Sequence, residues 1–354
     1  MKTIFFVFVL IIFGLATFAQ SPFEKKTTPL ATGFSAQDSI RLFYGALFKA
    51  FKIAYLHRKA VNWQRVESDV YSRLDRYVNF KKSLNEITPL FDTLKANHCI
   101  IYRDGDQYTG TKKKIPKDRY SNQWRKKYDS KPIFEAKILD GKYGYILIPG
   151  MVFMDTGEEN INRIAHPLYD QIAAIKQSYK IEGWVIDLRM NTGGNCAPML
   201  LSLYDLLGDN TIWGELNLHQ RQVSSYKLNQ GKYLQKSKVL AAINPTGELL
   251  DQAKVAVITG IFTGSSGEIV ALAFKGRPNT RFIGEDTSGY TTGNVKWPLP
   301  FDTHIALTTS YDSDRNGRYY DVVRPDILVS KLDNFDNLLF DVNIVEAIKF
   351  IKGS

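Results

Sequence analysis

The chain has 354 residues, with 46 lysines and arginines against 36 aspartates and glutamates, and carries a formal charge of +10 at pH 7. An apolar fraction of 44% is typical of a folded protein with a large core and excludes a mostly disordered chain. Two cysteines are too few for a disulfide-dense scaffold, and the spacing of cysteines and histidines predicts no metal site.

The N-terminus has the pattern of a secretory signal peptide. Residues 1–3 are short and basic, residues 4–18 are apolar, and small residues precede a cleavage site after Ala19. We predict that residues 1–19 are removed, leaving a chain with no membrane segment in the periplasm or the extracellular space. Because we expect the protein to be exported, we exclude nucleic acid as the partner of its excess positive charge.

Residues 20–97 are predicted to form an N-terminal helical domain. Apolar residues recur at three- and four-residue intervals from Ile40 to Phe51, again after Asn62, and in a third segment near residues 83–94. Pro89 lies inside the third segment, so that helix either begins later or kinks. The aromatic residues of these stripes indicate packing between helices.

Residues 98–133 are predicted to be a strand followed by a basic connector. Residues 97–102 have the composition of a strand, residues 103–106 that of a hairpin turn, and residues 107–132 are polar, basic and aromatic.

Residues 134–354 alternate between strand and helix patterns. Strands are predicted at 143–148, 184–188 and 255–259, with helices near 166–180 and 198–207 and a helix from Ser265. This alternation predicts a mixed sheet with parallel segments and helices on both faces.

Two small-residue turns follow apolar strands. Ser265 lies in TGSSGE (263–268), where a helix N-terminus with free amides favours a developing anion. The same Ser265-x-x-Glu268 spacing is also a capping box, which is usually structural. Gly193 and Gly194 follow the strand that ends near Leu188, and they suit either an oxyanion site or a tight turn.

Five motifs together carry a family resemblance: GYILIP (144–149), VIDLRMNTGG (185–194), TGSSGE (263–268), GEDTSG (284–289) and PDI (325–327). Their order resembles the C-terminal processing, or tail-specific, serine peptidases, a family that includes the tricorn-type enzymes. The resemblance implies a ClpP/crotonase-like α/β core and a serine endopeptidase that works by acyl transfer without a cofactor. We find no space for a PDZ domain, so this chain resembles a branch without one.

The resemblance also implies roles for individual residues. Ser265 matches the nucleophile, and the amides of Ser266 and of Gly193 or Gly194 match the oxyanion hole. Part of the family uses a lysine as base, but Tyr290 occupies that position here.

The tricorn-type branch uses a histidine, which His98 matches. That branch has a serine before the histidine, replaced here by Asn97. It also has a late glutamate that orients the histidine, whose counterpart is Tyr319 by strict spacing or Asp321 with a small gap.

Several alternatives remain open. A non-catalytic binding protein on the same fold, taking an apolar ligand or a peptide, would tolerate these departures from the motif. A basic module for an anionic cell-envelope polymer would rest on the lysine-rich connector alone. If His98 and the paired glycines surround Ser265, Cys99 and Cys196 come close enough for a disulfide hypothesis.

Residues 312–317 resemble the opening of a calcium loop but lack its closing acid, which favours a hairpin turn. The sequence leaves the oligomeric state open.

Overall fold

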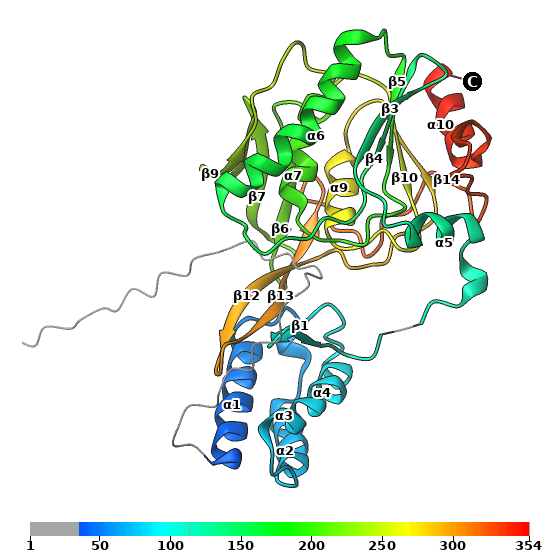
Figure 1. Ribbon diagram of the computed structural model, residues 1–354. Coiled ribbons are helices and arrows are strands. Elements are labelled where there is room, and N and C mark those ends of the chain that lie inside the picture. The colour runs from blue at the N-terminus through cyan, green and yellow to red at the C-terminus, as the bar shows by residue number, and fades with distance from the viewer. Residues whose placement is uncertain (1–34, 113, 354) are drawn as a thin grey trace, which may run out of the picture.

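The computed structural model describes residues 35–112 and 114–353, so the predicted signal peptide lies outside the described residues. Figure 1 shows a helical part at one end and an α/β part at the other, joined by a long strand hairpin. None of the described helices is long and apolar enough to span a membrane.

The helical part begins at Ser35, whose hydroxyl accepts a hydrogen bond from the amide of Asp38 and caps the first helix. Pro89 lies in the first turn of its helix, where an amide N–H is not needed, so the third predicted helix begins later rather than kinking. The helices are α1 (Ala36–Ala54), α2 (Trp63–Leu74), α3 (Phe80–Ser83) and α4 (Ile87–Leu94), with 3-10 turns at Arg58–Ala60 and Leu84–Glu86.

An antiparallel sheet of eight strands connects the two parts. Strand β13 (Thr303–Ser313) pairs with β1 at one end, where Ile305 lies opposite Ile101, and with β6 at the other, where Asp312 lies opposite Glu215. The hairpin of β12 and β13 also packs on the helices through Leu299 and Ile305. The remaining strands are β1 (Ile100–Arg103), β2 (Asp106–Tyr108), β6 (Thr211–Leu216), β7 (Gln222–Asn229), β8 (Lys232–Gln235), β9 (Lys238–Ala242) and β12 (Thr292–Leu299).

The second sheet has six strands in the order β14-β11-β10-β5-β4-β3. Its pairs are parallel except for β3 with β4, as expected for strands that alternate with covering helices. The strands are β3 (Glu135–Leu139), β4 (Tyr143–Leu147), β5 (Gly183–Asp187), β10 (Val255–Thr259), β11 (Thr280–Gly284) and β14 (Ile327–Leu328).

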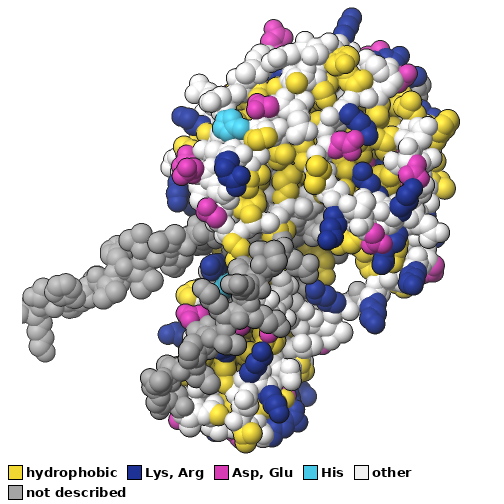
Figure 2. Space-filling view, viewed as in Figure 1, with side chains coloured by type: hydrophobic (Ala, Val, Ile, Leu, Met, Phe, Trp, Pro, Cys, Tyr) yellow, Lys and Arg dark blue, Asp and Glu magenta, His cyan; other side chains and the backbone are white. Residues whose placement is uncertain are grey.

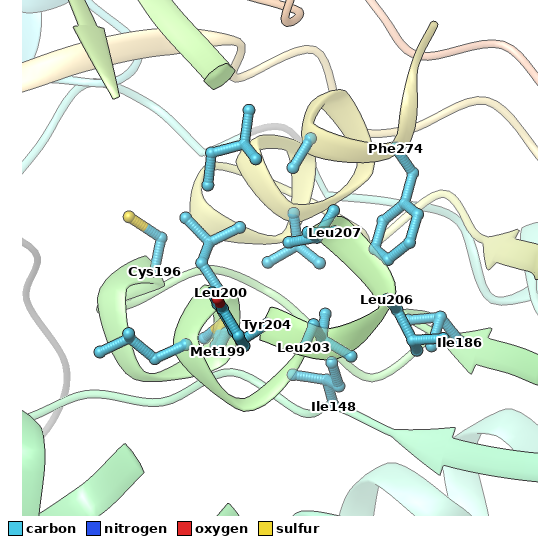
Figure 3. Close-up of a cluster of buried hydrophobic side chains, with 14 of the residues drawn as sticks. Ile148, Ile186, Cys196, Met199, Leu200, Leu203, Tyr204, Leu206, Leu207 and Phe274 are labelled. Carbon is cyan, nitrogen blue, oxygen red and sulfur yellow. The ribbon is translucent and has the colours of Figure 1, made fainter. Parts of the chain in front are cut away.

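Helices cover both faces of this sheet. Ile186 and Val257 point to one face, and Val185 and Ala256 to the other. One face carries α6 (Glu158–Ser178), α7 (Cys196–Ser202), α8 (Tyr204–Leu207) and α9 (Ser266–Phe274), and the other carries α5 (Asn122–Asp129) and α10 (Val342–Lys352). Further 3-10 turns lie at Lys117–Arg119 and Leu338–Phe340. Figure 3 shows the buried apolar side chains packed between α7, α8 and α9, the helix that begins beside Ser265.

Two expectations differ from the structure. Helix α6 begins at Glu158 rather than near His166, so Pro167 lies inside it. Packing of Ile161 and Ala165 against the sheet outweighs the missing hydrogen bond of the proline. The disulfide hypothesis is wrong, because Cys99 and Cys196 are free thiols, each buried at its own position.

The predicted boundaries at residues 97/98 and 133/134 stay a prediction. The segments they separate share a sheet, because β1 pairs with β13.

On the face seen in Figure 2, lysine and arginine side chains are spread over both parts of the molecule rather than gathered in one patch.

Candidate active site

Ser265 sits at the turn between β10 and α9 in a strained backbone conformation, with φ 53° and ψ −116°. Such a conformation is costly for a residue with a side chain and persists only where its surroundings hold it. The amide of Ser265 donates to Glu268 Oε2 at 2.9 Å, which is the glutamate half of a capping box. The turn leaves the serine half-buried, with its hydroxyl at the edge of a cavity.

Glu268 is buried and binds two loops at once. Besides the Ser265 amide, its carboxylate accepts hydrogen bonds from the hydroxyl of Thr287 at 2.5 Å and from the amides of Gly289 and Tyr290 at 2.9 and 2.8 Å. Burial raises the pKa of Glu268 to about 7. Glu268 therefore positions the serine turn and residues 287–290 and does not face the serine hydroxyl as a base.

His98 lies in the turn between α4 and β1 and contacts two hydroxyl groups. Its Nε2 is 3.2 Å from Ser265 Oγ, and its Nδ1 is 2.8 Å from Thr292 Oγ1. The ring also packs against Tyr290, with centroids 5.1 Å apart. Burial lowers the pKa of His98 to about 4, so the imidazole is neutral near pH 7. A neutral ring accepts the Ser265 proton at Nε2 only when Nδ1 carries the hydrogen and donates to Thr292.

The hairpin holds the backbone around His98. Asn294 donates from Nδ2 to the carbonyl of His98 at 2.8 Å, and its Oδ1 accepts from the hydroxyl of Thr308 at 2.8 Å. The amide of Thr308 in turn lies 3.4 Å from the sulfur of Cys99. Strands β12 and β13 thus contact both the ring and the main chain of the histidine segment.

The glycine turn after β5 lies directly against the serine turn. Gly193 and Gly194 have φ values of 118° and 116°, which side-chain-bearing residues rarely adopt. A Cβ on Gly193 would lie 3.1 Å from the Cβ of Ser265, and one on Gly194 would lie 1.8 Å from the carbonyl oxygen of Met151. Glycine is therefore required at both positions for the two turns to meet.

The amides of Gly194 and Ser266 have no acceptor within the described part of the chain, and the same is true of the Thr192 amide in the glycine turn. The amide of Gly193, by contrast, donates to Asn191 Oδ1 at 3.1 Å. The hydroxyl of Ser266 donates to the carbonyl of Gly194. This bond ties the turns together and leaves Ser265 as the serine whose hydroxyl contacts the histidine.

The other residues singled out in the sequence lie away from the histidine ring nitrogens. Asn97 is exposed at the cavity. Asp321 is also exposed, and its carboxylate pairs with Arg324 at 3.0 Å. Tyr319 packs on the ring of Tyr311. Thr292, which contacts Nδ1, was not singled out in the sequence.

A cavity of about 800 Å³ runs past both turns and the histidine. Its lining includes Tyr55, Lys95, His98, Lys112, Gly193, Gly194, Cys196, Trp213, Glu215, Ser265, Ser266, Ile269, Tyr290, Thr292, Gly293 and Tyr311. A space of this size accommodates several side chains of an extended peptide beside the serine.

Comparison with known proteins gives one matching family model, Peptidase family S41, over residues 142–329, about half of the chain. The nisin-resistance protein of Lactococcus lactis subsp. lactis is 33% identical over 153 residues, which are 41% of this chain and 45% of that protein. The chain therefore matches less than half the length of this relative.

Solved structures support the fold. A lipoprotein from Streptococcus agalactiae superposes with a TM-score of 0.65 at 21% identity, covering 92% of this chain and 99% of that one. A protein from Parabacteroides merdae superposes with a TM-score of 0.56 at 18% identity, covering 90% and 97%. The predicted α/β core with an N-terminal helical region is confirmed.

Proposed function

Because the chain belongs to peptidase family S41, we propose that it is a serine endopeptidase in which Ser265 is the nucleophile and His98 the general base. The observation that carries the proposal is the 3.2 Å separation between His98 Nε2 and Ser265 Oγ. This separation is within reach for direct proton transfer between a hydroxyl and an imidazole.

The reaction follows from this geometry. Ser265 Oγ attacks the peptide carbonyl while its proton passes to His98 Nε2. The imidazolium then gives that proton to the leaving amine, and water repeats the sequence on the acyl-enzyme. Thr292 takes the orienting place expected of Asp321. Its neutral hydroxyl fixes the tautomer of His98 and stabilises the imidazolium less than a carboxylate does.

The oxyanion is stabilised by the amides of Gly194 and Ser266 in this proposal. Both amides lack an acceptor among the described residues. Ser266 follows Ser265 in the chain, and its hydroxyl donates to the carbonyl of Gly194. The amide of Gly193 is already engaged by Asn191 and serves the shape of the turn. Preorganised backbone donors of this kind stabilise developing charge without reorganisation during the reaction.

The pairing of a serine with a histidine from the segment before the core supports the histidine-using, tricorn-type branch, without a PDZ domain. We further propose that the protein is exported through the signal peptide predicted at residues 1–19 and acts on peptides outside the cytoplasm. The partial similarity to a nisin-resistance protein makes nisin the first peptide to test.

Labelling with a fluorophosphonate probe tests the nucleophile. We expect the wild-type protein to form an adduct on Ser265, and Ser265→Ala to lose it. Ser266→Ala, the matched control, retains its backbone amide and the neighbouring nucleophile, so it should still be labelled. Absence of labelling of the folded wild-type protein between pH 5 and pH 9 would favour the non-catalytic binding protein instead.

A further inference from the structure

Three oxygen atoms converge beside Gly293, one residue from the threonine that contacts His98. A Cβ placed on Gly293 would lie 2.4 Å from Ser310 Oγ, 3.3 Å from Asp312 Oδ1 and 3.4 Å from Glu215 Oε1. The two acids come from neighbouring strands, because Asp312 of β13 lies directly opposite Glu215 of β6. The strand register therefore places two carboxyl groups together beside Gly293, in the hairpin of β12 and β13.

This cluster is short of hydrogen-bond donors. Within the described residues, Ser310 Oγ and both carboxyl oxygens of Asp312 have no partner, although the Asp312 side chain is fully buried. The Tyr226 hydroxyl is the group that hydrogen-bonds Glu215. Buried carboxyl oxygens without donors are costly, and burial raises the pKa of Asp312 well above its ordinary value and that of Glu215 to about 7. A cationic group that reaches Glu215 from the cavity would favour the ionised form of this carboxyl group and offset the cost of its burial.

Glu215 and Gly293 line the cavity that contains Ser265, whereas Ser310 and Asp312 are buried and do not line it. Glu215 is half-buried, and it is the one acid among the described residues that line this cavity. Trp213 lines the wall beside it and stacks on Tyr226, with ring centroids 3.9 Å apart. An aromatic wall leading to a carboxylate suits a side chain with an apolar stem and a cationic head.

We propose that Glu215, backed by Asp312, is a specificity-determining site that binds the lysine or arginine side chain of a peptide substrate. The inference rests on the proposed function, since it assigns a subsite to the same cavity. A metal ion is a poorer occupant, because the described residues include no group of three or more histidine, cysteine, aspartate or glutamate side chains able to hold one. The lysine or arginine head supplies N–H donors and a positive charge to Glu215, the acid that lines the cavity.

Peptide binding to the full chain carrying Ser265→Ala tests the site without requiring catalysis. Fluorescent decapeptide mixtures fix one position at a time as lysine, arginine, norleucine or glutamate. We expect one position at which lysine or arginine binds about tenfold or more tightly than norleucine, with glutamate weakest, as for a charge-assisted hydrogen bond in a desolvated site. Equal binding of lysine and norleucine at every position would overturn the proposal.

The isosteric change Glu215→Gln in the same background removes the charge and keeps the volume. It should abolish the preference for lysine, whereas Glu182→Gln, an exposed acid that lies outside the cavity, should keep it. A preference that survives Glu215→Gln in the folded protein, or one that requires added Ca²⁺ and disappears with chelator, contradicts the assignment.

The two proposals fail separately. If the Ser265→Ala protein binds lysine or arginine peptides selectively but the wild type cleaves no peptide, the peptidase proposal is rejected and the subsite proposal stands. Cleavage by the wild type with no charge preference in binding removes the subsite and keeps the peptidase.

Discussion

The hydroxyl of Thr292 lies 2.8 Å from Nδ1 of His98, although 194 residues separate the two in the chain. Thr292 begins β12, and the same hairpin also supports the main chain of His98 through Asn294. The group facing the remote nitrogen of the proposed base is thus a neutral hydroxyl on a strand, and the exposed Asp321 pairs with Arg324 instead.

Substitutions of Thr292 distinguish the effect of its hydroxyl on the orientation of His98 from the effect of its side-chain volume on packing. Thr292→Val keeps the branched shape and removes the oxygen, so the imidazole loses the partner that fixes its tautomer. We expect kcat/KM to fall about tenfold to a hundredfold, mostly in kcat, and Thr292→Ser to recover most of the loss. Steady-state kinetics with a fluorogenic peptide measure both variants. Equal activity of the valine and wild-type proteins would remove Thr292 from the mechanism.

The pH dependence of activity reports the state of His98. Burial lowers its pKa from 6.5 to about 4, and only the neutral ring accepts the serine proton. Activity is therefore present above the lowered pKa and is lost as the pH falls through about 4. The acidic limb of kcat/KM gives the pKa of the free enzyme. A midpoint near 6.5 in that limb would show that His98 titrates as an exposed histidine.

Gly194→Ala should be far more harmful than an alanine at a glycine that has a milder positive φ and open space around it. At Gly194 the new methyl group overlaps the Met151 carbonyl, whereas at Gly141, with φ 69°, nothing lies within 4 Å of it. Gly141→Ala should cost about 1 kcal/mol of unfolding free energy. Gly194→Ala should cost several times more, or distort the turn so that probe labelling at Ser265 fails. Denaturant titration and labelling of both variants, side by side, check this; similar losses would contradict the close contact.

The contribution of Glu215 to the free energy of unfolding should decrease as pH rises from about 4.5 to 7. Burial raises the pKa of Glu215 from 4.5 to about 7, so the folded chain holds this proton more tightly than the unfolded chain does. The contribution is present in full below pH 4.5 and disappears as the pH passes through 7, for a change of about 3 kcal/mol at most. Urea titrations at pH 5 and pH 8 measure it. The free energy of unfolding should depend less on pH in Glu215→Gln than in the wild type. An unchanged dependence in that variant would contradict the raised pKa of Glu215.

The parts of the fold and the site that could be predicted are those that depend on a short, contiguous segment of sequence. A strand, a small-residue turn and a helix in succession predict the Ser265 turn, and paired glycines after a strand predict the second turn. His98 carries no local signal and was identified through the family resemblance. Thr292 and Glu215 were missed, and Asp312 was considered only as part of a calcium-like loop. Strand register brings all three residues to their places, and register depends on partners far along the chain.

Helix α6 shows how a strong local signal misleads. A proline suits the first turn of a helix, and Pro167 agrees with the predicted start near residue 166, but the helix begins nine residues before this proline, at Glu158. The charges of Glu158 and Glu159 suit the positive end of a helix. The acidic pair was the better marker of the start. A buried apolar stripe on both sides of the proline keeps the helix continuous.

The proposed nucleophile and base come from opposite sides of an interlayer contact, 167 residues apart in the chain. A nascent or partly denatured molecule whose α/β half has formed while β1 is still undocked from β13 holds Ser265 without a proton acceptor. Under the mechanism proposed above, such a molecule cannot cleave the unfolded copies around it. Docking of the helical half completes the proposed serine–histidine pair, so activity would arise only in chains that have completed assembly.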